Sequence, residues 1–145
     1  MDKTNVKIRK VKNTDTYYLY KLLSERSSKV NISHKTMPTY KEHINFTKSK
    51  PYSKWYIILN NNKKIGSIYI TKINEIGMSL EKEFDKDQIK KNILKLLMTE
   101  NPKKRYLVNI SPKNTKSINF FKKNGFNLIQ NTYEFLIDDK ENEEN

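Results

Sequence analysis

Residues 74–97, NEIGMSLEKEFDKDQIKKNILKLL, constrain the fold more than any other stretch of this chain. The first part, Asn74 to Leu80, has the length and apolar content of a short buried strand. The part that follows has a helix pattern, with apolar residues at i, i+4, i+7 and i+8, namely Ile89, Ile93, Leu96 and Leu97. A strand that leads into a helix places free backbone amides at the helix N-terminus, so the stretch predicts an anion-binding site.

Length and composition limit the possible classes of protein. With 145 residues, the chain is expected to form a single domain over residues 1–137, followed by an acidic, disordered tail over 138–145. No apolar run approaches the ~18 residues of a membrane span and no secretory leader is visible, which favours a cytoplasmic protein without membrane association. The lack of cysteine excludes disulfides and thiolate catalysis, and with only two histidines we expect no metal site.

The net charge of +13 raises the alternative of nucleic-acid binding, since clustered Lys and Arg neutralise phosphates. The lysines, however, are spread along the whole chain, which also lacks alanine and has few arginines and glycines. That composition is typical of an AT-rich genome. We therefore interpret the charge as a solvated surface that attracts acidic small molecules, and we expect any nucleic-acid contact to be nonspecific.

The segments before the central stretch predict one strand, two helices and a hairpin. Residues 6–11 alternate as a strand, and an apolar stripe then predicts a helix to about Arg26. Thr39, with a glutamate three residues later, has the spacing of a capping box and predicts the start of a second helix. Two β-rich runs, 55–59 and 65–70, flank asparagines that tolerate the positive φ of a hairpin turn.

The segments after the central stretch complete an α/β fold. They predict a buried strand over 106–110, a helix over 114–124 that Gly125 stops, and a final hairpin of strands 126–130 and 132–137. The full order is β α α β β β α β α β β. Such an order needs a mixed, mostly antiparallel central sheet with helices on both faces.

This order, with NEIGMSLEKEFDKDQIKKNIL at its centre and NTKSINFFKKNGF near its end, resembles the GNAT superfamily of acyl-CoA-dependent N-acyltransferases. NEIGMSL is similar to the family's central strand, which presents backbone groups to pantetheine and often carries a glutamate. In the family's later helix a small residue follows an asparagine by three positions and Gly-Phe closes the unit. The residues at that spacing here are Asn114, Ser117, Phe120, Phe121, Gly125 and Phe126.

The family's pyrophosphate signature is degenerate in this chain. Its pattern, Arg or Gln, two variable residues, Gly, one variable residue and then Gly or Ala, falls without a gap on Asp85, Gln88 and Lys90. Asp85 and Gln88 have capping-box spacing, so we expect Asp85 to accept a bond from the Gln88 amide and to repel a phosphate. Lys86, Lys90 and Lys91 could instead hold a pyrophosphate as point charges, or they could form only the solvated face of the helix.

Acyl transfer to an amine needs a base for the amine, a polarised thioester carbonyl and a proton for the leaving thiolate. Glu75 is the candidate catalytic base, because its place on the central strand resembles that of the family's glutamate; the alternative is an exposed residue paired with a lysine. The family's tyrosine acid is replaced here by Phe121, which cannot donate a proton. The remaining hydroxyl candidates are Tyr106, Ser111, Ser117 and Tyr133.

The resemblance implies an N-acetyltransferase that moves an acetyl group from acetyl-CoA, as cosubstrate, to a primary amine. EHINF followed by WYIILNNNKKIGSIYI is faintly similar to acetyltransferases of nucleotide-linked amino-sugar pathways, which leaves the acceptor between such a sugar and another small amine. The alternative is a GNAT-like module without catalysis that binds a CoA derivative, a nucleotide or a protein. The oligomeric state stays open, a homodimer included. The resemblance implies that the cofactor is bound by Met78, Ser79, Leu80, Asp85, Lys86, Gln88, Ile89, Lys90, Asn114, Ser117 and Phe121.

Overall fold

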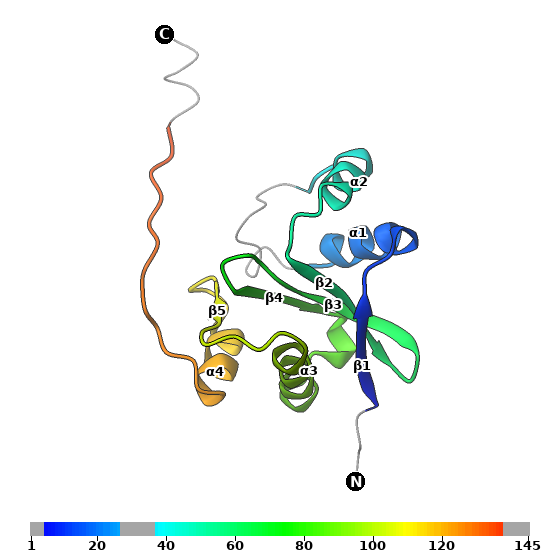
Figure 1. Ribbon diagram of the computed structural model, residues 1–145. Helices are drawn as coiled ribbons and strands as arrows, with labels where there is room; N and C mark the ends of the chain where they lie inside the picture. Colours follow the sequence, from blue (N-terminus) through cyan, green and yellow to red (C-terminus); the bar gives the residue numbers. More distant parts are fainter. Residues whose placement is uncertain (1–4, 27–36, 138–145) are drawn as a thin grey trace.

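A computed structural model describes residues 5–26 and 37–137, which form a five-stranded sheet with helices on both faces (Figure 1). The expected acidic tail, 138–145, lies outside the described residues. Adjacent strands are antiparallel except for the last pair, which is parallel. The predicted fold class, a mixed and mostly antiparallel sheet, is confirmed. In sheet order the strands are β1 (Val6–Lys10), β2 (Lys54–Asn60), β3 (Lys63–Ile70), β4 (Glu75–Leu80) and β5 (Leu107–Val108).

Two pairs of helices sandwich this sheet. The first pair, α1 (Thr16–Ser24) and α2 (Tyr40–Lys48), covers one face, and the second pair, α3 (Asp87–Glu100) and α4 (Thr115–Lys123), covers the other (Figure 1). In the described parts of the chain, no helix combines the length and the apolar character needed to span a membrane. Short 3-10 turns precede α1 and α3, at η1 (Asn13–Asp15) and η2 (Lys82–Phe84).

Local sequence signals form the elements that they predict. The Thr39 hydroxyl accepts a hydrogen bond from the Glu42 amide at 3.1 Å, and the Glu42 carboxylate accepts one from the Thr39 amide at 2.8 Å. This capping box starts α2 as expected. Asn61 and Asn62 have φ values of 50° and 66° in the turn between β2 and β3, which confirms the predicted hairpin.

The main core lies between the sheet and α3. Strand alternation turns Tyr56 and Ile58 of β2 toward this core, where Ile93 and Leu97 of α3 are fully buried. Ile57 is also fully buried, and because it lies between Tyr56 and Ile58 it faces the opposite side of the sheet. The helix stripe predicted from sequence is therefore confirmed in its central residues.

The predicted final hairpin is absent from the described chain. Residues 126–137 contain no strand, and they run outward from α4 instead of returning along the sheet (Figure 1). A two-stranded hairpin is only marginally stable unless its apolar face packs against other structure. Because β5 is only two residues long, the chain's own sheet offers a very short edge for such pairing.

Candidate functional site

The central feature of the site is a fork between β4 and β5. The two strands pair only through Glu75 with Leu107 and Ile76 with Val108. Beyond these pairs they separate, so residues 77–80 of β4 bond to β3 on one side and have no β5 partner on the other. Peptide groups on that edge remain open to a ligand. The fork opens into a groove of about 2940 Å³, and the predicted residues Met78, Ser79 and Leu80 all line it.

Glu75 lies at the point where the fork begins. The side-chain amide of Asn109 donates to Glu75 Oε2 at 2.7 Å, and the Thr71 hydroxyl donates to Oε1 at 3.4 Å. Thr71 also accepts a hydrogen bond from the Glu75 amide at 3.0 Å. Neutral donors thus orient the carboxylate, and no lysine of the described chain pairs with it. A carboxylate has about four acceptor positions, so Glu75 keeps lone pairs that can accept a hydrogen bond from a bound amine.

Asn109 is a site residue that sequence reasoning missed. Leu107 is the parallel partner of Glu75, and Asn109 lies two residues further along the chain, on the same face. The sequence could have indicated this asparagine, in YLVNI, only if the residue-by-residue pairing of the parallel strands β4 and β5 had also been predicted. Its hydrogen bond holds Glu75 against the neighbouring strand end.

The N-terminus of α3 does not have the predicted cap. The helix begins at Asp87, with Lys86 at the N-cap position in an extended conformation. Asp85 instead ends the η2 turn with ψ of 70°, one residue too early to bond the Gln88 amide, so that part of the prediction is wrong. Gln88 contacts Asn92 through their side chains at 3.3 Å. No side chain of the described residues caps α3, and its first-turn amides are available to an anion.

Asp85 is neutralised by two lysines. Lys90 is only 7% exposed, and its Nζ lies 3.2 Å from Asp85 Oδ1 and 4.6 Å from the centre of the Phe120 ring. Lys116 of α4 lies 3.4 Å from Oδ2 and also donates to the Asp85 carbonyl oxygen at 3.0 Å. Lys90 is thus an internal partner of Asp85, whereas Lys86 is an exposed cation at the helix start. The repulsion expected from Asp85 is reduced accordingly.

Helix α4 forms another side of the groove. The Asn114 side chain accepts from the Ser117 amide at 3.2 Å, which confirms the predicted cap. Phe121 packs edge-on against Phe120 and Phe126, each with a ring-centre distance of 5.1 Å. Ser117 and Phe121 both line the groove. The second motif of the resemblance therefore lies along the same groove as the free edge of β4.

The four hydroxyl candidates occupy different surroundings. The Tyr106 hydroxyl donates to the Asn101 carbonyl at 2.7 Å and accepts from the Lys103 amide at 2.9 Å, so it supports the chain after α3. Tyr133 is 89% exposed on the outward-running segment. All four candidates line the groove. Ser111 and Ser117 are the two that neither support the chain after α3 nor lie on the outward-running segment.

An aromatic group on the α1–α2 side of the groove was also missed by sequence reasoning. The Tyr52 and Tyr69 rings stack in parallel with their centres 3.6 Å apart, and Tyr52 packs edge-on against Trp55 at 4.8 Å. The Tyr69 ring lies across Gly77 of β4, where a Cβ atom would overlap it. Burial raises the pKa of both tyrosines above its ordinary value, so both hydroxyls stay neutral. These rings provide an apolar wall beside Glu75.

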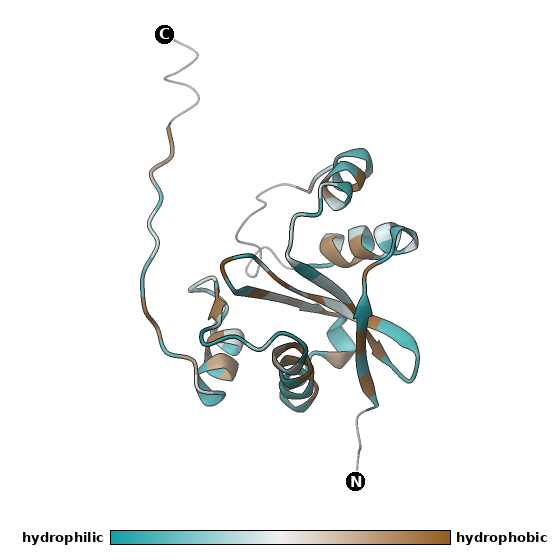
Figure 2. Cartoon of the chain, in the orientation of Figure 1, coloured by the Kyte–Doolittle hydropathy of each residue, from teal (hydrophilic) through white to brown (hydrophobic). Residues whose placement is uncertain are grey.

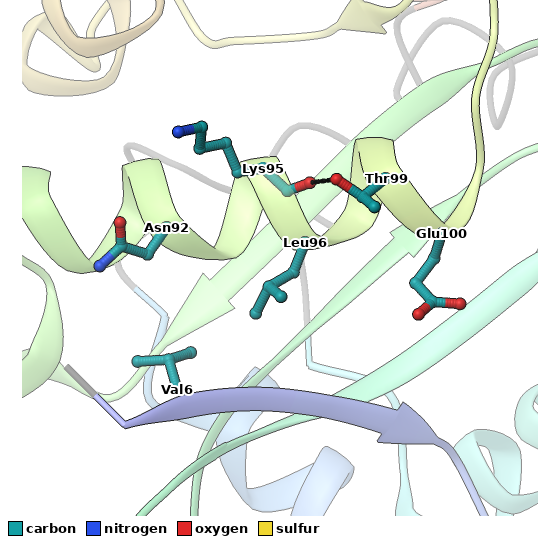
Figure 3. A pocket seen from close by; sticks show the side chains of 6 residues that line it. All are labelled: Val6, Asn92, Lys95, Leu96, Thr99 and Glu100. Atoms are coloured by element: carbon teal, nitrogen blue, oxygen red, sulfur yellow. Dashed lines mark hydrogen bonds between the residues drawn. The ribbon is translucent and has the colours of Figure 1, made fainter.

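A smaller pocket of about 440 Å³ lies between β1 and α3 and contains none of the predicted site residues (Figure 3). Leu96, which the helix pattern placed with the buried stripe, is half-buried here and points toward Val6 of β1 (Figure 3). In the described residues, no cluster of three or more His, Asp or Glu side chains could hold a metal ion.

Comparisons with known proteins identify the fold. No protein-family model and no curated relative matches the chain. Among solved structures, a domain from Methanocaldococcus jannaschii has a TM-score of 0.74 at 23% identity, covering 91% of this chain and 94% of that one. RimL, a ribosomal L7/L12 α-N-protein acetyltransferase in complex with coenzyme A, has a TM-score of 0.68 at 19% identity, covering 89% and 83%. A variant of the spermidine N-acetyltransferase SpeG from Vibrio cholerae has a TM-score of 0.66 at 12% identity, covering 83% and 78%.

The chain therefore has the fold of the GNAT N-acetyltransferases, as the sequence resemblance predicted. At identities of 12–23%, these likenesses establish the fold and leave the activity to the chemistry of the site.

Proposed function

We propose that this protein is an N-acetyltransferase that transfers an acetyl group from acetyl-CoA to a primary amine. The observation that carries the proposal is the fork at Glu75. It brings a candidate base and an unpaired strand edge to one groove, which Asp85 and Lys90, on either side of the uncapped start of α3, also line. The fold neighbours that are N-acetyltransferases support the same class of reaction.

The residues present suit an acyl-CoA. Free peptide groups at Met78 and Leu80, which alternate with the β3-bonded Ser79, can pair with the amides of a pantetheine arm, in the way that a peptide adds to a strand edge. The first-turn amides of α3, with the exposed Lys86 beside them, suit a pyrophosphate. Lys116 adds a second ammonium group near that helix start.

The proposed reaction uses Glu75 as the proton acceptor. As the amine nitrogen bonds to the acyl carbon, its proton passes to the carboxylate, directly or through water, and the carbon–sulfur bond breaks. Asn109 and Thr71 hold the carboxylate in place. Phe121 has no proton to give, so the leaving thiolate takes its proton from solvent or from Ser111 or Ser117.

The acceptor is proposed to enter beside the aromatic wall. Neutral rings at Tyr52, Trp55 and Tyr69 favour a flat or ring-shaped group next to the amine. A nucleotide-linked amino sugar fits this wall and the positive net charge, and other small amines form the comparison set. The order of acceptors in an amine screen tests this part of the proposal.

The experiment combines calorimetry with a Glu75 variant. We expect wild-type protein to bind acetyl-CoA selectively over ATP at moderate salt. Glu75→Gln should keep that affinity and lose turnover by about 10²–10⁴-fold, the usual contribution of a general base. Glu83→Gln, at an exposed glutamate in the same region, is the matched control and should retain full activity. Unchanged turnover in Glu75→Gln would remove this residue from the mechanism.

The second candidate is a GNAT-like binding module without catalysis. The observation that favours it is the α3 start, where Asp85 and the buried Lys90 pair with each other and no glycine opens the backbone. This function predicts no acetyl transfer to any amine, even if acetyl-CoA binds more strongly than ATP. Selective binding with turnover would exclude it.

A further inference from the structure

The Tyr69 hydroxyl lies over the backbone of β4 at the point where the fork opens. Tyr69 on β3 is paired with Gly77 on β4, and its ring and hydroxyl oxygen occupy the space that a side chain at residue 77 would fill. Ile76 is the last residue of β4 that pairs with β5, so Gly77 is the first residue beyond the fork. A tyrosine hydroxyl therefore reaches the strand edge that is proposed to hold the acyl-CoA.

This hydroxyl lies on the same face of β4 as the candidate base. Glu75 and Gly77 are two residues apart, so they face the same side of the strand. Ile76, between them, faces the other side and is buried in the core that contains the apolar residues of α3. Glu75 and the Tyr69 hydroxyl are therefore both on the α1–α2 side of the sheet, where the acceptor amine is proposed to enter.

The Tyr69 hydroxyl keeps its proton and can donate a hydrogen bond. Burial is the main cause of its raised pKa; the charge of Arg26 and a hydrogen bond from Tyr52 oppose the rise, and the charge of Glu75 adds to it. Because Tyr52 is the donor in the bond between the two hydroxyls, the Tyr69 proton is not used there. No residue in the described part of the chain accepts a hydrogen bond from Tyr69, so its proton is available to a ligand.

A second free donor lies at the next position of β4. The Thr71 amide donates to the Glu75 carbonyl at 2.9 Å, and from there every second pair of the β3–β4 ladder is hydrogen-bonded. The Met78 amide falls between two such pairs and points to the side from which β5 has separated. Two neutral donors, a backbone amide and a phenol, thus lie at neighbouring positions of the β4 edge.

The surroundings of the hydroxyl are suited to the stabilisation of charge. The Tyr52 ring stacks on the Tyr69 ring with centres 3.6 Å apart and holds it in place. Helix α1, with its apolar parts brown in Figure 2 and with Leu19 and Leu22 buried, covers the same face of the sheet. A donor fixed in surroundings of low dielectric constant stabilises a developing negative charge more than the same donor does in water.

We propose that the Tyr69 hydroxyl stabilises the oxyanion that forms on the acyl group during acetyl transfer, beside the Met78 amide; this inference rests on the proposed function. As the amine nitrogen bonds to the acyl carbon, the carbonyl π electrons move onto the oxygen. Tyr69 donates a hydrogen bond to that oxygen and keeps its proton. The carbonyl re-forms as the carbon–sulfur bond breaks, the thiolate leaves with the electrons of that bond, and the amine proton passes to Glu75.

The first test measures the polarisation of the carbonyl and needs no acceptor. Wild type and Tyr69→Phe are loaded with acetyl-CoA that carries ¹³C at the carbonyl, and infrared difference spectra are taken against the unlabelled complex. We expect the carbonyl stretch at a higher frequency in Tyr69→Phe, with acetyl-CoA affinity unchanged by calorimetry. The variant keeps the ring across Gly77, so its Tm should stay near that of wild type. Equal frequencies in the two complexes would overturn the inference.

The second test is kinetic and uses an amine that serves as acceptor. Tyr69→Phe should lower kcat about 10²–10³-fold, the usual effect of removing one oxyanion donor, with little change in KM for acetyl-CoA. Tyr17→Phe, at an exposed tyrosine outside the groove lining, is the matched control and should keep the wild-type kcat and carbonyl frequency.

The outcomes separate this inference from the proposed function. An unchanged kcat in Tyr69→Phe would refute the role of the hydroxyl and leave the acetyltransferase standing. A frequency change in Tyr69→Phe, with no acetyl transfer to any amine by wild type, would support the contact with the acyl oxygen and refute the proposed function. A wild-type protein that does not bind acetyl-CoA would refute both.

Discussion

Replacing Asp15 by alanine is expected to destabilise the fold strongly. Its side chain is completely buried and accepts two hydrogen bonds from the Arg9 guanidinium, at 2.8 and 2.9 Å. Lys64 Nζ lies 2.8 Å from the same carboxylate, and the Lys12 amide donates to it at 2.7 Å. These contacts join β1, the η1 turn and β3. Asp15→Ala leaves all three donors without this acceptor.

The magnitude follows from the burial of the carboxylate and the exposure of its partners. Removing one member of a buried ion pair costs about 3–5 kcal/mol. The Arg9 and Lys64 side chains are 29% and 35% exposed, so water can solvate them after the substitution and the loss should fall near the lower limit. A loss of about 3 kcal/mol is a large share of a typical 5–15 kcal/mol stability. It should lower Tm by roughly 10 °C in a domain of this size.

The pH dependence provides a second, independent readout. Burial opposes the charged form of Asp15, but the hydrogen bonds from Arg9, Lys64 and Lys12 outweigh it and hold the pKa well below its usual range. Because the folded-state pKa is lowered, the stabilisation is fully present above the unfolded value of about 3.9 and is lost as the pH falls toward the folded value. The difference between wild type and Asp15→Ala should therefore be constant from about pH 5 to 7 and shrink below about pH 4.

Urea unfolding at pH 7, 5 and 3, followed by fluorescence of the single tryptophan, measures both effects. Asp87→Ala is the control, since Asp87 is 57% exposed and lies 3.8 Å from its lysine partner. Lys90 keeps Asp85 as its closer partner, at 3.2 Å, so the loss of the exposed Asp87 should cost at most about 1 kcal/mol. A loss below about 1 kcal/mol for Asp15→Ala at pH 7, or a loss that does not shrink in acid, would refute the reasoning.

Three further substitutions test the fold and the site. Gly77→Ala places a Cβ atom on the Tyr69 ring, so we expect a loss of about 1–3 kcal/mol in thermal unfolding; an unchanged Tm would show that the ring can move freely. Leu97→Ala empties a fully buried position and should cost about 2–5 kcal/mol in urea unfolding, whereas a cost under about 1 kcal/mol would contradict the core assignment. Thr39→Ala removes the acceptor for the Glu42 amide and should cost about 0.5–2 kcal/mol by the same assay, with no loss if solvent replaces the cap.

Short-range patterns predicted much of the fold. The capping box at Thr39, the cap at Asn114 and the left-handed residues Asn61, Asn62 and Gly125 all have the expected conformations or contacts. Each depends on residues at most a few positions apart, so tertiary context has little power to change it. The GNAT resemblance was confirmed at the level of the fold. It rests on the order of helices and strands, and local signals such as these caps and turns predict that order.

The sequence predicted the contacts of individual site residues less well than it predicted the fold. The spacing of Asp85 and Gln88 fits a capping box. In the structure, however, Asp85 is the C-cap of the η2 turn, and the N-cap of α3 is the next residue, Lys86. Local spacing could not reveal that Lys116, from a different helix, competes for the same carboxylate. Asn109 likewise meets Glu75 only through the parallel register of β4 and β5.

The sequence by itself determined the kinds and order of the elements as far as α4, the caps at Thr39 and Asn114, the turn between β2 and β3, and the faces of α3 and β2 that are buried. Periodicity and capping are set by contacts within a turn or two of the chain, so they can be read without knowing the partner. The tertiary structure alone decided where β4 and β5 separate, which lysines neutralise Asp85, and which tyrosines flank Gly77. It also decided the course of residues 126–137. Their strand-like sequence predicts that they pair with another strand. An apolar strand pairs equally well with any compatible edge, however, so only the arrangement of the whole fold selects the edge.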